Sequence, residues 1–134
     1  MIDIKTLRPG NLVEILSEAN PVILPTGILR KVTEIKFRTL TVIDPEIPEH
    51  KQPPLSLDVS QIGAIPLGVD ELEKMGFKKH GDWMIRESLL HTQINVHIPS
   101  WKCTIGHNEE YEIEPQKYYH DMQNLIFSLN REEL

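Results

Sequence analysis

Residues 1–65 carry their apolar side chains in short runs that proline and glycine interrupt, and no run repeats with the period of a helix. Alternation and β-branched residues predict strands at residues 11–16, 27–35, 39–43, 55–59 and 64–65. Residues 44–54 hold four of the ten prolines, which lack the N–H that a strand ladder needs, so this segment is predicted to be a loop. Five short strands around such a loop predict a small antiparallel barrel of the SH3-like kind.

A different pattern begins at Pro66. Residues 69–75 have acids in the first turn and a lysine near the end, and Gly76 follows where a helix commonly ends in a left-handed residue. Residues 92–98 then alternate between apolar and polar side chains. This alternation predicts an antiparallel sheet with one face in water.

The last predicted element is a helix at about residues 115–130, with Pro115 at its first position. Its apolar side chains at helical spacing, within about 60° of arc, are Tyr118, Met122, Leu125 and Leu129. This stripe and the strands need each other's apolar surface, so we expect one buried cluster. The cluster would join the stripe to Trp83, Ile94, Val96 and Trp101.

The predicted fold class is therefore α+β and rich in strands. Residues 1–66 would form the small barrel, and residues 67–134 would form a unit of helix, antiparallel strands and closing helix. The net charge is −6, and residues 67–134 carry most of it, with twelve acids against seven bases. Such a surface repels a phosphate backbone, so general binding to nucleic acid is disfavoured.

Cys103 is the single cysteine, which excludes an intramolecular disulfide and favours a reducing compartment. Residues 1–10 mix charged with apolar side chains and lack the apolar run of a signal peptide. No segment reaches the length of a transmembrane helix. We therefore expect a cytoplasmic protein that does not bind membranes.

Three segments of the chain, taken together, resemble a known family. They are residues 7–13 (LRPGNLV), residues 65–77 (IPL at the start and MGF at the end) and residues 117–134 (KYYHDMQNLIFSL, then EEL). The combination resembles a family of small proteins from gut anaerobic bacteria and their prophages or mobile elements. The resemblance implies one fold over the whole chain and no particular activity, cofactor or site. Gly68 stands where the family pattern has a hydroxyl residue that caps the helix.

A metal or catalytic site is conceivable around Cys103. This cysteine and His107, with Glu109 or Glu110, are spaced so that a turn gathers three ligands, and Zn²⁺ accepts such a mixture. However, the alternation places Cys103 on an apolar face, where free cysteine acts as a small hydrophobic residue. No glycine-rich elbow adjoins it to activate a nucleophile. We expect no metal, no cofactor and no catalysis, and keep a small enzyme or metal site as an alternative.

A basic edge is the first candidate binding site. Arg30, Lys36 and Arg38 fall along one predicted strand edge, with Phe37 between the last two as a group on which a base or side chain can stack. Solubilising charges on a solvated strand explain the same residues. A groove for a peptide or a nucleic acid is the functional alternative.

The polar side of the closing helix is the second candidate. His120, Gln123, Asn124 and Phe127 lie opposite the apolar stripe, so one large apolar side chain stands among three hydrogen-bonding ones. This pattern is more typical of an interface than of a free helix face, although a helix packed on both sides also explains it.

From these features we expect a non-enzymatic accessory or adaptor protein, encoded by a prophage or mobile element, that acts through protein–protein contacts. Its partner would be another protein or a second copy of the chain. One alternative is a nucleic-acid-binding module that uses the edge from Arg30 to Arg38. The other is the small enzyme or metal site around Cys103 and His107.

Overall fold

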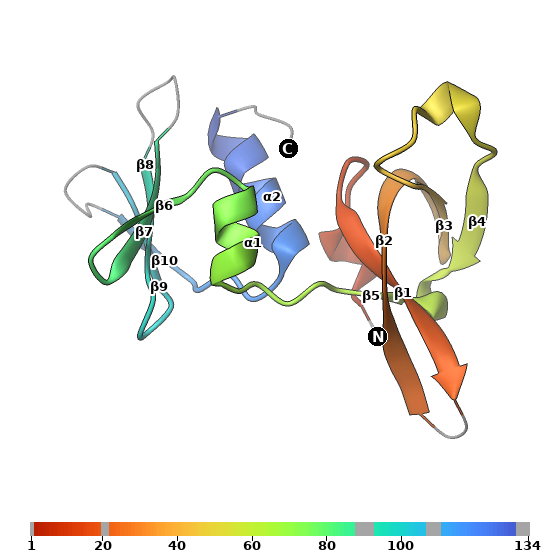
Figure 1. Cartoon of the computed structure of the whole chain (residues 1–134), viewed down its shortest axis with the longest axis horizontal. Helices are drawn as coiled ribbons and strands as arrows, with labels where there is room; N and C mark the ends of the chain where they lie inside the picture. Colours follow the sequence, from red (N-terminus) through yellow and green to blue (C-terminus); the bar gives the residue numbers. More distant parts are fainter. Residues whose placement is uncertain (1, 20–21, 88–92, 107–110, 131–134) are drawn as a thin grey trace. The chain divides into compact units, whose positions relative to one another are not determined.

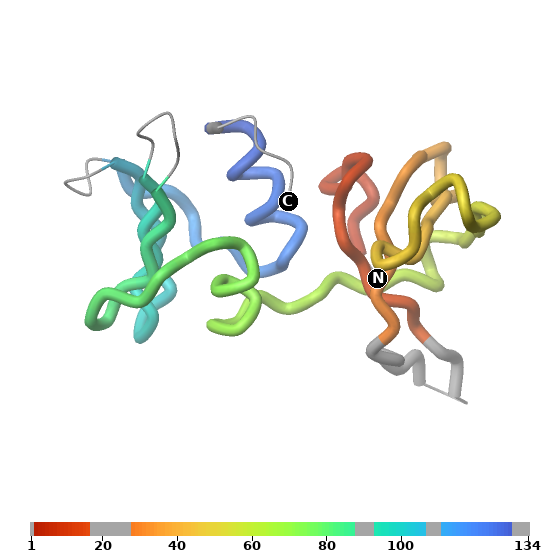
Figure 2. The backbone as a smooth tube through the Cα atoms, turned by 45° about the horizontal axis from the view of Figure 1, so that its top comes forward, coloured from red at the N-terminus to blue at the C-terminus, as the bar shows by residue number. Residues whose placement is uncertain are grey.

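The computed structural model describes residues 2–19, 22–87, 93–106 and 111–130. The chain divides into two compact units, Met1–Ile65 and Pro66–Leu134 (Figures 1 and 2). Each unit has one five-stranded antiparallel sheet, and the second also has the α-helices of the described chain. The predicted α+β class, rich in strands, is confirmed. Within the described ranges, no helix is both long and apolar enough to span a membrane.

The first unit consists mainly of strands, as its proline and glycine punctuation predicts. Its strands are β1 (Leu12–Ala19), β2 (Val22–Lys36), β3 (Thr39–Ile43), β4 (Leu55–Asp58) and β5 (Ile62–Gly63). Short 3-10 helices are η1 (Ile4–Thr6), η2 (Glu49–Lys51) and η3 (Val59–Gln61). The proline-rich segment between β3 and β4 holds η2 and no strand, as predicted.

The sheet of the first unit is open. Its strand order is β4-β3-β2-β1-β5, so β4 and β5 lie at opposite edges and, among the described residues, do not pair with each other. The SH3-like barrel that the sequence predicted is therefore not confirmed. The physical reason lies in β5, which has only two residues and pairs with β1 alone.

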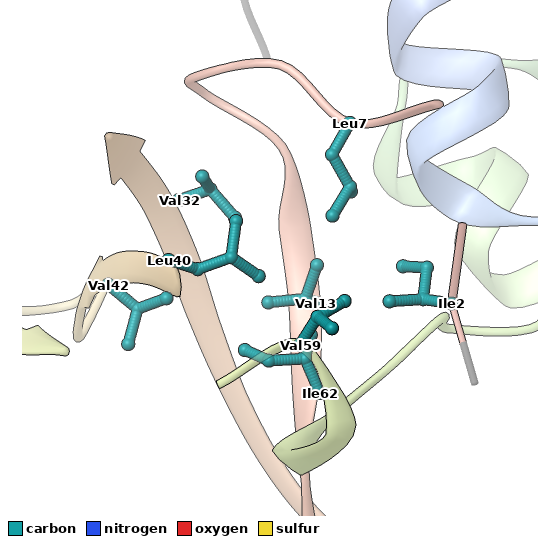
Figure 3. Packing of buried hydrophobic residues seen from close by; sticks show 8 residues of the cluster. All are labelled: Ile2, Leu7, Val13, Val32, Leu40, Val42, Val59 and Ile62. Atoms are coloured by element: carbon teal, nitrogen blue, oxygen red, sulfur yellow. The ribbon is translucent and has the colours of Figure 1, made fainter. Parts of the chain in front are cut away.

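One apolar core holds this sheet together (Figure 3). Val13 of β1, Val32 of β2 and Leu40 of β3 are each 0% exposed. The rest of the buried cluster is Ile2, Leu7, Val42, Val59 and Ile62. Burying an aliphatic side chain of this size contributes roughly 1.5–3 kcal/mol, so the cluster stabilises the first unit substantially.

The second unit is a five-stranded meander with helices on one side of it (Figures 1 and 2). Its elements are α1 (Val69–Lys74), β6 (Lys78–His80), β7 (Trp83–Glu87), β8 (Gln93–His97), β9 (Lys102–Ile105), β10 (Tyr111–Ile113) and α2 (Tyr119–Asn130). The strand order β10-β9-β8-β7-β6 follows the chain, because each strand pairs with the next.

Helix α1 ends where the sequence predicts. Gly76 has a φ of 95°, a left-handed conformation that glycine adopts without steric cost. The buried side chain of Arg86, on β7, donates from Nε to the carbonyl oxygen of Met75 at 2.8 Å. This hydrogen bond satisfies a carbonyl at the end of α1 and ties the helix to the sheet.

The buried face of the second sheet differs from the prediction by one residue in β7. Met84 is paired with Val96 and both are buried, whereas Trp83 is paired with His97 on the opposite face. The two rings are 4.9 Å apart. Trp83 was therefore wrongly assigned to the core. Trp101 was also predicted to lie in the buried cluster. It is instead half-buried in the turn before β9, with a φ of 58°.

Helix α2 buries a different stripe from the predicted one. Tyr118 precedes the helix, forms a bridge with Pro66 and is 41% exposed. Because Tyr118 is outside the helix, it does not set the helical phase. The buried apolar side chains of α2 are Tyr119, Met122 and Ile126, whereas Leu125 and Leu129 are half-buried.

The polar face of β8 is not open to water, contrary to the prediction. Gln93 and Asn95 are 8% and 3% exposed. Gln93 Nε2 donates to Asn95 Oδ1 at 2.6 Å, and Asn95 Nδ2 donates to Thr104 Oγ1 at 3.1 Å and to the Gly106 carbonyl at 2.9 Å. These bonds form a buried polar ladder between β8 and β9, which removes the cost of burying the amides.

Candidate functional site

The structure places the predicted basic edge at the end of β2 and in the turn that follows it. Lys36 is the last residue of β2, and Phe37 and Arg38 form a two-residue turn before β3. We call these three residues the hairpin tip. Arg30 lies roughly 20 Å away along β2 at about 3.3 Å per residue, and its Nη1 donates to the preceding backbone carbonyl at 2.8 Å. Arg30 is therefore not part of the tip.

Phe37 is the most exposed large apolar side chain at the tip, with 98% of its surface exposed. Its φ is 51°, and Arg38 after it does not share a positive φ. A positive φ at the first of two turn residues is typical of a type II′ turn, where glycine is usual. A left-handed backbone costs a non-glycine residue about 1–2 kcal/mol, so Phe37 is held in a strained conformation.

The tip rests on η3. The N–H of Val59 donates to the carbonyl of Arg38 at 2.7 Å. Asp58 caps η3, since its Oδ2 accepts from the N–H and hydroxyl of Ser60 at 3.0 and 2.6 Å, while its own N–H donates to Gln61 Oε1. This capping box fixes the segment that supports the turn.

Both cations of the tip are paired with carboxylates. Lys36 Nζ lies 3.3 Å from Glu34 Oε1, and Arg38 Nη2 lies 3.7 Å from Asp58 Oδ2. The hydrogen bonds from Ser60, with a smaller contribution from Arg38, hold the pKa of Asp58 below its usual value. The tip and its acidic neighbours thus carry no net charge.

A hollow of about 430 Å³ adjoins Phe37 on the outward face of β2, β3 and β4. It is lined by Glu34, Lys36, Phe37, Thr39, Thr41 and Ser56. The register explains this grouping, because Thr41 is paired with Glu34 on one side and with Ser56 on the other. In the part of the chain that the structure describes, the hydroxyls of Thr39, Thr41 and Ser56 make no hydrogen bond.

The sequence interpretation missed the hydroxyl side of this site. It singled out Lys36, Phe37 and Arg38 by charge and aromatic character, which are local signals. Thr39 and Thr41 alternate on β3, which marks a shared face. Their neighbourhood with Ser56 depends on the pairing of β3 with β4, and the sequence does not show that register.

The predicted contact face on α2 is largely buried. His120 and Gln123 are 1% and 3% exposed, and Asn124 and Phe127 are half-buried. The prediction of an open face is therefore wrong at His120 and Gln123, because the helix begins at Tyr119 and its buried phase includes them. A partner on the side of Asn124 and Phe127 stays a prediction.

The buried ring of His120 contacts two neighbouring side chains, Tyr118 and Asp121. Its ring stacks on Tyr118 with centroids 5.9 Å apart, and its Nε2 lies 3.4 Å from Asp121 Oδ1. Burial lowers the pKa of His120, and the carboxylate of Asp121 opposes that shift in part. The neutral imidazole is therefore favoured at neutral pH.

Cys103 is buried, with 1% of its surface exposed, as predicted. Burial raises the pKa of its thiol to about 11, so the thiolate is scarce at neutral pH. The other members of the alternative site, His107, Glu109 and Glu110, lie outside the described residues.

Among the residues that the structure describes, no group of three or more histidine, cysteine or acidic side chains is arranged to hold a metal ion. The hairpin tip and its hollow are therefore the candidate binding site of the described chain. Comparisons of the chain with protein-family models, with curated proteins and with solved structures found no match.

Proposed function

We propose that this protein has no catalytic activity and works by binding, with the hairpin tip as the element that it presents to a partner protein. The observation that carries the proposal is Phe37, which is 98% exposed in a strained backbone conformation. An exposed phenyl ring is unfavourable in water, and the left-handed backbone adds about 1–2 kcal/mol. Contact with another molecule is a reason for the chain to keep both features.

The support beneath the tip favours such a role. The hydrogen bond from Val59 to Arg38 and the ion pair of Arg38 with Asp58 hold the turn in place. A contact group that is already ordered loses little conformational entropy when a partner docks. Aromatic residues, phenylalanine among them, are also enriched at protein interfaces.

The charge pattern favours a protein over a nucleic acid as the partner. Lys36 lies 3.3 Å from the carboxylate of Glu34, and Arg38 lies 3.7 Å from that of Asp58. Nucleic-acid binding depends mainly on cations that neutralise phosphates, and paired cations contribute little to it.

The proposal is tested by site-specific photo-crosslinking in the native host. A photoreactive phenylalanine analogue is placed at position 37 and, as a control, at position 51, since Lys51 is also exposed to solvent, on η2. We expect a discrete crosslinked protein from position 37 and none from position 51. If the crosslink joins two copies of this chain, the partner is the protein itself.

A second measurement uses the partner identified in this way. Phe37→Ser should weaken its binding at least about tenfold, as expected for a central aromatic contact. The thermal unfolding of the variant should stay unchanged, because the ring has no neighbours to lose. Equal crosslinking at both positions, or binding that survives Phe37→Ser, would contradict the proposed function.

A further inference from the structure

The hollow beside Phe37 has the features of a seat for a peptide main chain. Thr39, Thr41 and Ser56 are short, so an extended chain can approach the sheet closely above them. Each hydroxyl can donate one hydrogen bond and accept others, and within the described chain none of the three is used. Main-chain N–H and C=O groups need both kinds of partner.

The spacing of the hydroxyls matches the repeat of an extended peptide. Thr39 and Thr41 are two residues apart on β3 and lie on the same face, which separates them by roughly 7 Å. An extended chain presents main-chain groups on one side with the same repeat of two residues. Such a chain can therefore bond to both threonines without bending.

The charges of the hollow restrict the ligand further. Among the described residues that line it, the charged side chains are Glu34 and Lys36, which are paired at 3.3 Å and sum to zero charge. A strongly charged ligand would have to break this pair and then face an unpaired group of either sign. Among the described residues that line the hollow, the ring of Phe37 is the largest apolar group.

We propose that the hollow binds an extended, uncharged peptide segment of the partner. Its main chain bonds to the hydroxyls of Thr39, Thr41 and Ser56, and one large apolar side chain packs on Phe37. This inference rests on the proposed function, since it specifies the part of the partner that the tip recognises. Specificity comes from the apolar anchor, and the main-chain bonds contribute affinity.

The test uses a random dodecapeptide library displayed on phage and the intact protein as bait. We expect the selected peptides to share one large apolar residue and to lack net charge. Synthetic copies should bind the wild type and lose at least about tenfold in affinity to Phe37→Ser. Thr41→Val keeps the β-branched shape and removes the hydroxyl, so it should weaken binding several-fold.

The control is Ser128→Ala, which removes an exposed hydroxyl on α2, and its affinity for the peptides should equal that of the wild type. Selected peptides without a shared anchor, or with unchanged affinity for Phe37→Ser and Thr41→Val, would overturn the inference. Binding of a single-stranded oligonucleotide that depends on Phe37 would overturn it as well, because that ligand is charged.

The two proposals fail in different ways. If position 37 crosslinks to a partner whose binding needs Phe37, but Thr41→Val leaves that binding unchanged and no peptide is selected, the proposed function holds and the peptide seat is wrong. If the crosslink at position 37 is also absent, both proposals are wrong.

Discussion

Phe37 and Trp101 are the non-glycine residues of the described chain with a positive φ, and their side chains differ in surroundings. Trp101 is half-buried, so packing of its large ring offsets part of the backbone strain. Phe37 is 98% exposed, so its own side chain gains no packing that would offset the strain. Side-chain packing therefore supports this backbone feature at Trp101, whereas at Phe37 the contacts of Arg38 with Val59 and Asp58 support it.

This difference predicts that Phe37→Asn stabilises the protein. Asparagine adopts the left-handed region more readily, so the free energy of unfolding should rise by up to about 1 kcal/mol. Thermal or chemical unfolding measures the change. Arg38→Asn is a control in the same turn: its φ is not positive, so no gain is expected, and loss of the exposed ion pair with Asp58 should lower stability by less than about 1 kcal/mol. A loss of more than about 1 kcal/mol would show that the Phe37 ring packs against the protein.

Cys103 should be chemically silent in the folded protein. With 1% exposure and a pKa raised to about 11, its thiol should react slowly with a thiol reagent under native conditions and rapidly after unfolding. Labelling rates with and without denaturant measure this contrast. Fast native labelling, together with zinc in the purified protein, would restore the metal site as a candidate.

At the scale of elements, the ends of a helix were easier to predict from the sequence than the face that the helix buries. Acids in the first turn and Gly76 gave α1 correctly, since helix ends depend on neighbouring residues. The phase of α2 was missed because Tyr118 fits the helical spacing but pairs with Pro66, which is far away in the sequence. In the same way, the hairpin tip could be suspected from its residues, whereas the hollow needed the pairing of β3 with β4.

The corrected phase of α2 is tested by two neighbouring alanine substitutions. Ile126 is 0% exposed, so Ile126→Ala should cost about 2–5 kcal/mol of unfolding free energy. Leu125 is half-buried, so Leu125→Ala removes a similar volume and should cost clearly less. Denaturant unfolding of both variants gives the comparison. A larger cost at Leu125 would restore the stripe predicted from the sequence.

The cap of η3 should make stability depend on pH. The pKa of Asp58 is lower in the folded protein than its usual value, so the ionised carboxylate stabilises the fold above the unfolded pKa of about 4. That contribution is lost as the pH falls from about 4 through the folded pKa. Melting temperatures measured over this range should fall more steeply for the wild type than for Asp58→Asn. Asp82→Asn, at an exposed acid, serves as control; a wild-type slope in Asp58→Asn would refute the assignment.

At the scale of the whole molecule, the distribution of charge distinguishes a protein-binding function from a nucleic-acid-binding function. The net charge is −6, and residues 1–66 are nearly balanced, with eight acids and seven bases. Neither half offers the excess of cations that attracts phosphates from a distance. A surface of this kind suits partners that are recognised by shape and apolar contact.

We therefore expect no useful affinity for nucleic acid. A fluorescent single-stranded oligothymidine should bind with a Kd weaker than about 10⁻⁴ M at physiological salt, beyond the usual range of non-specific binding. Fluorescence anisotropy measures this, with a basic single-strand-binding protein as positive control. Tighter binding that weakens steeply as salt is added would favour the nucleic-acid alternative at Lys36 and Arg38.

The buried polar ladder also affects how the second sheet chooses its strand pairing. Sliding β9 by two residues along β8 keeps every side chain on its proper face, so apolar burial alone tolerates the mistake. In that misaligned sheet Asn95 faces Lys102 or Gly106 instead of Thr104, and neither residue has a hydroxyl that could replace Thr104 Oγ1 as the acceptor of its amide hydrogen. A buried donor without an acceptor costs about 1–3 kcal/mol. The ladder therefore helps to specify the strand register. It disfavours, during folding, the off-register pairings that hydrophobic contacts alone would permit.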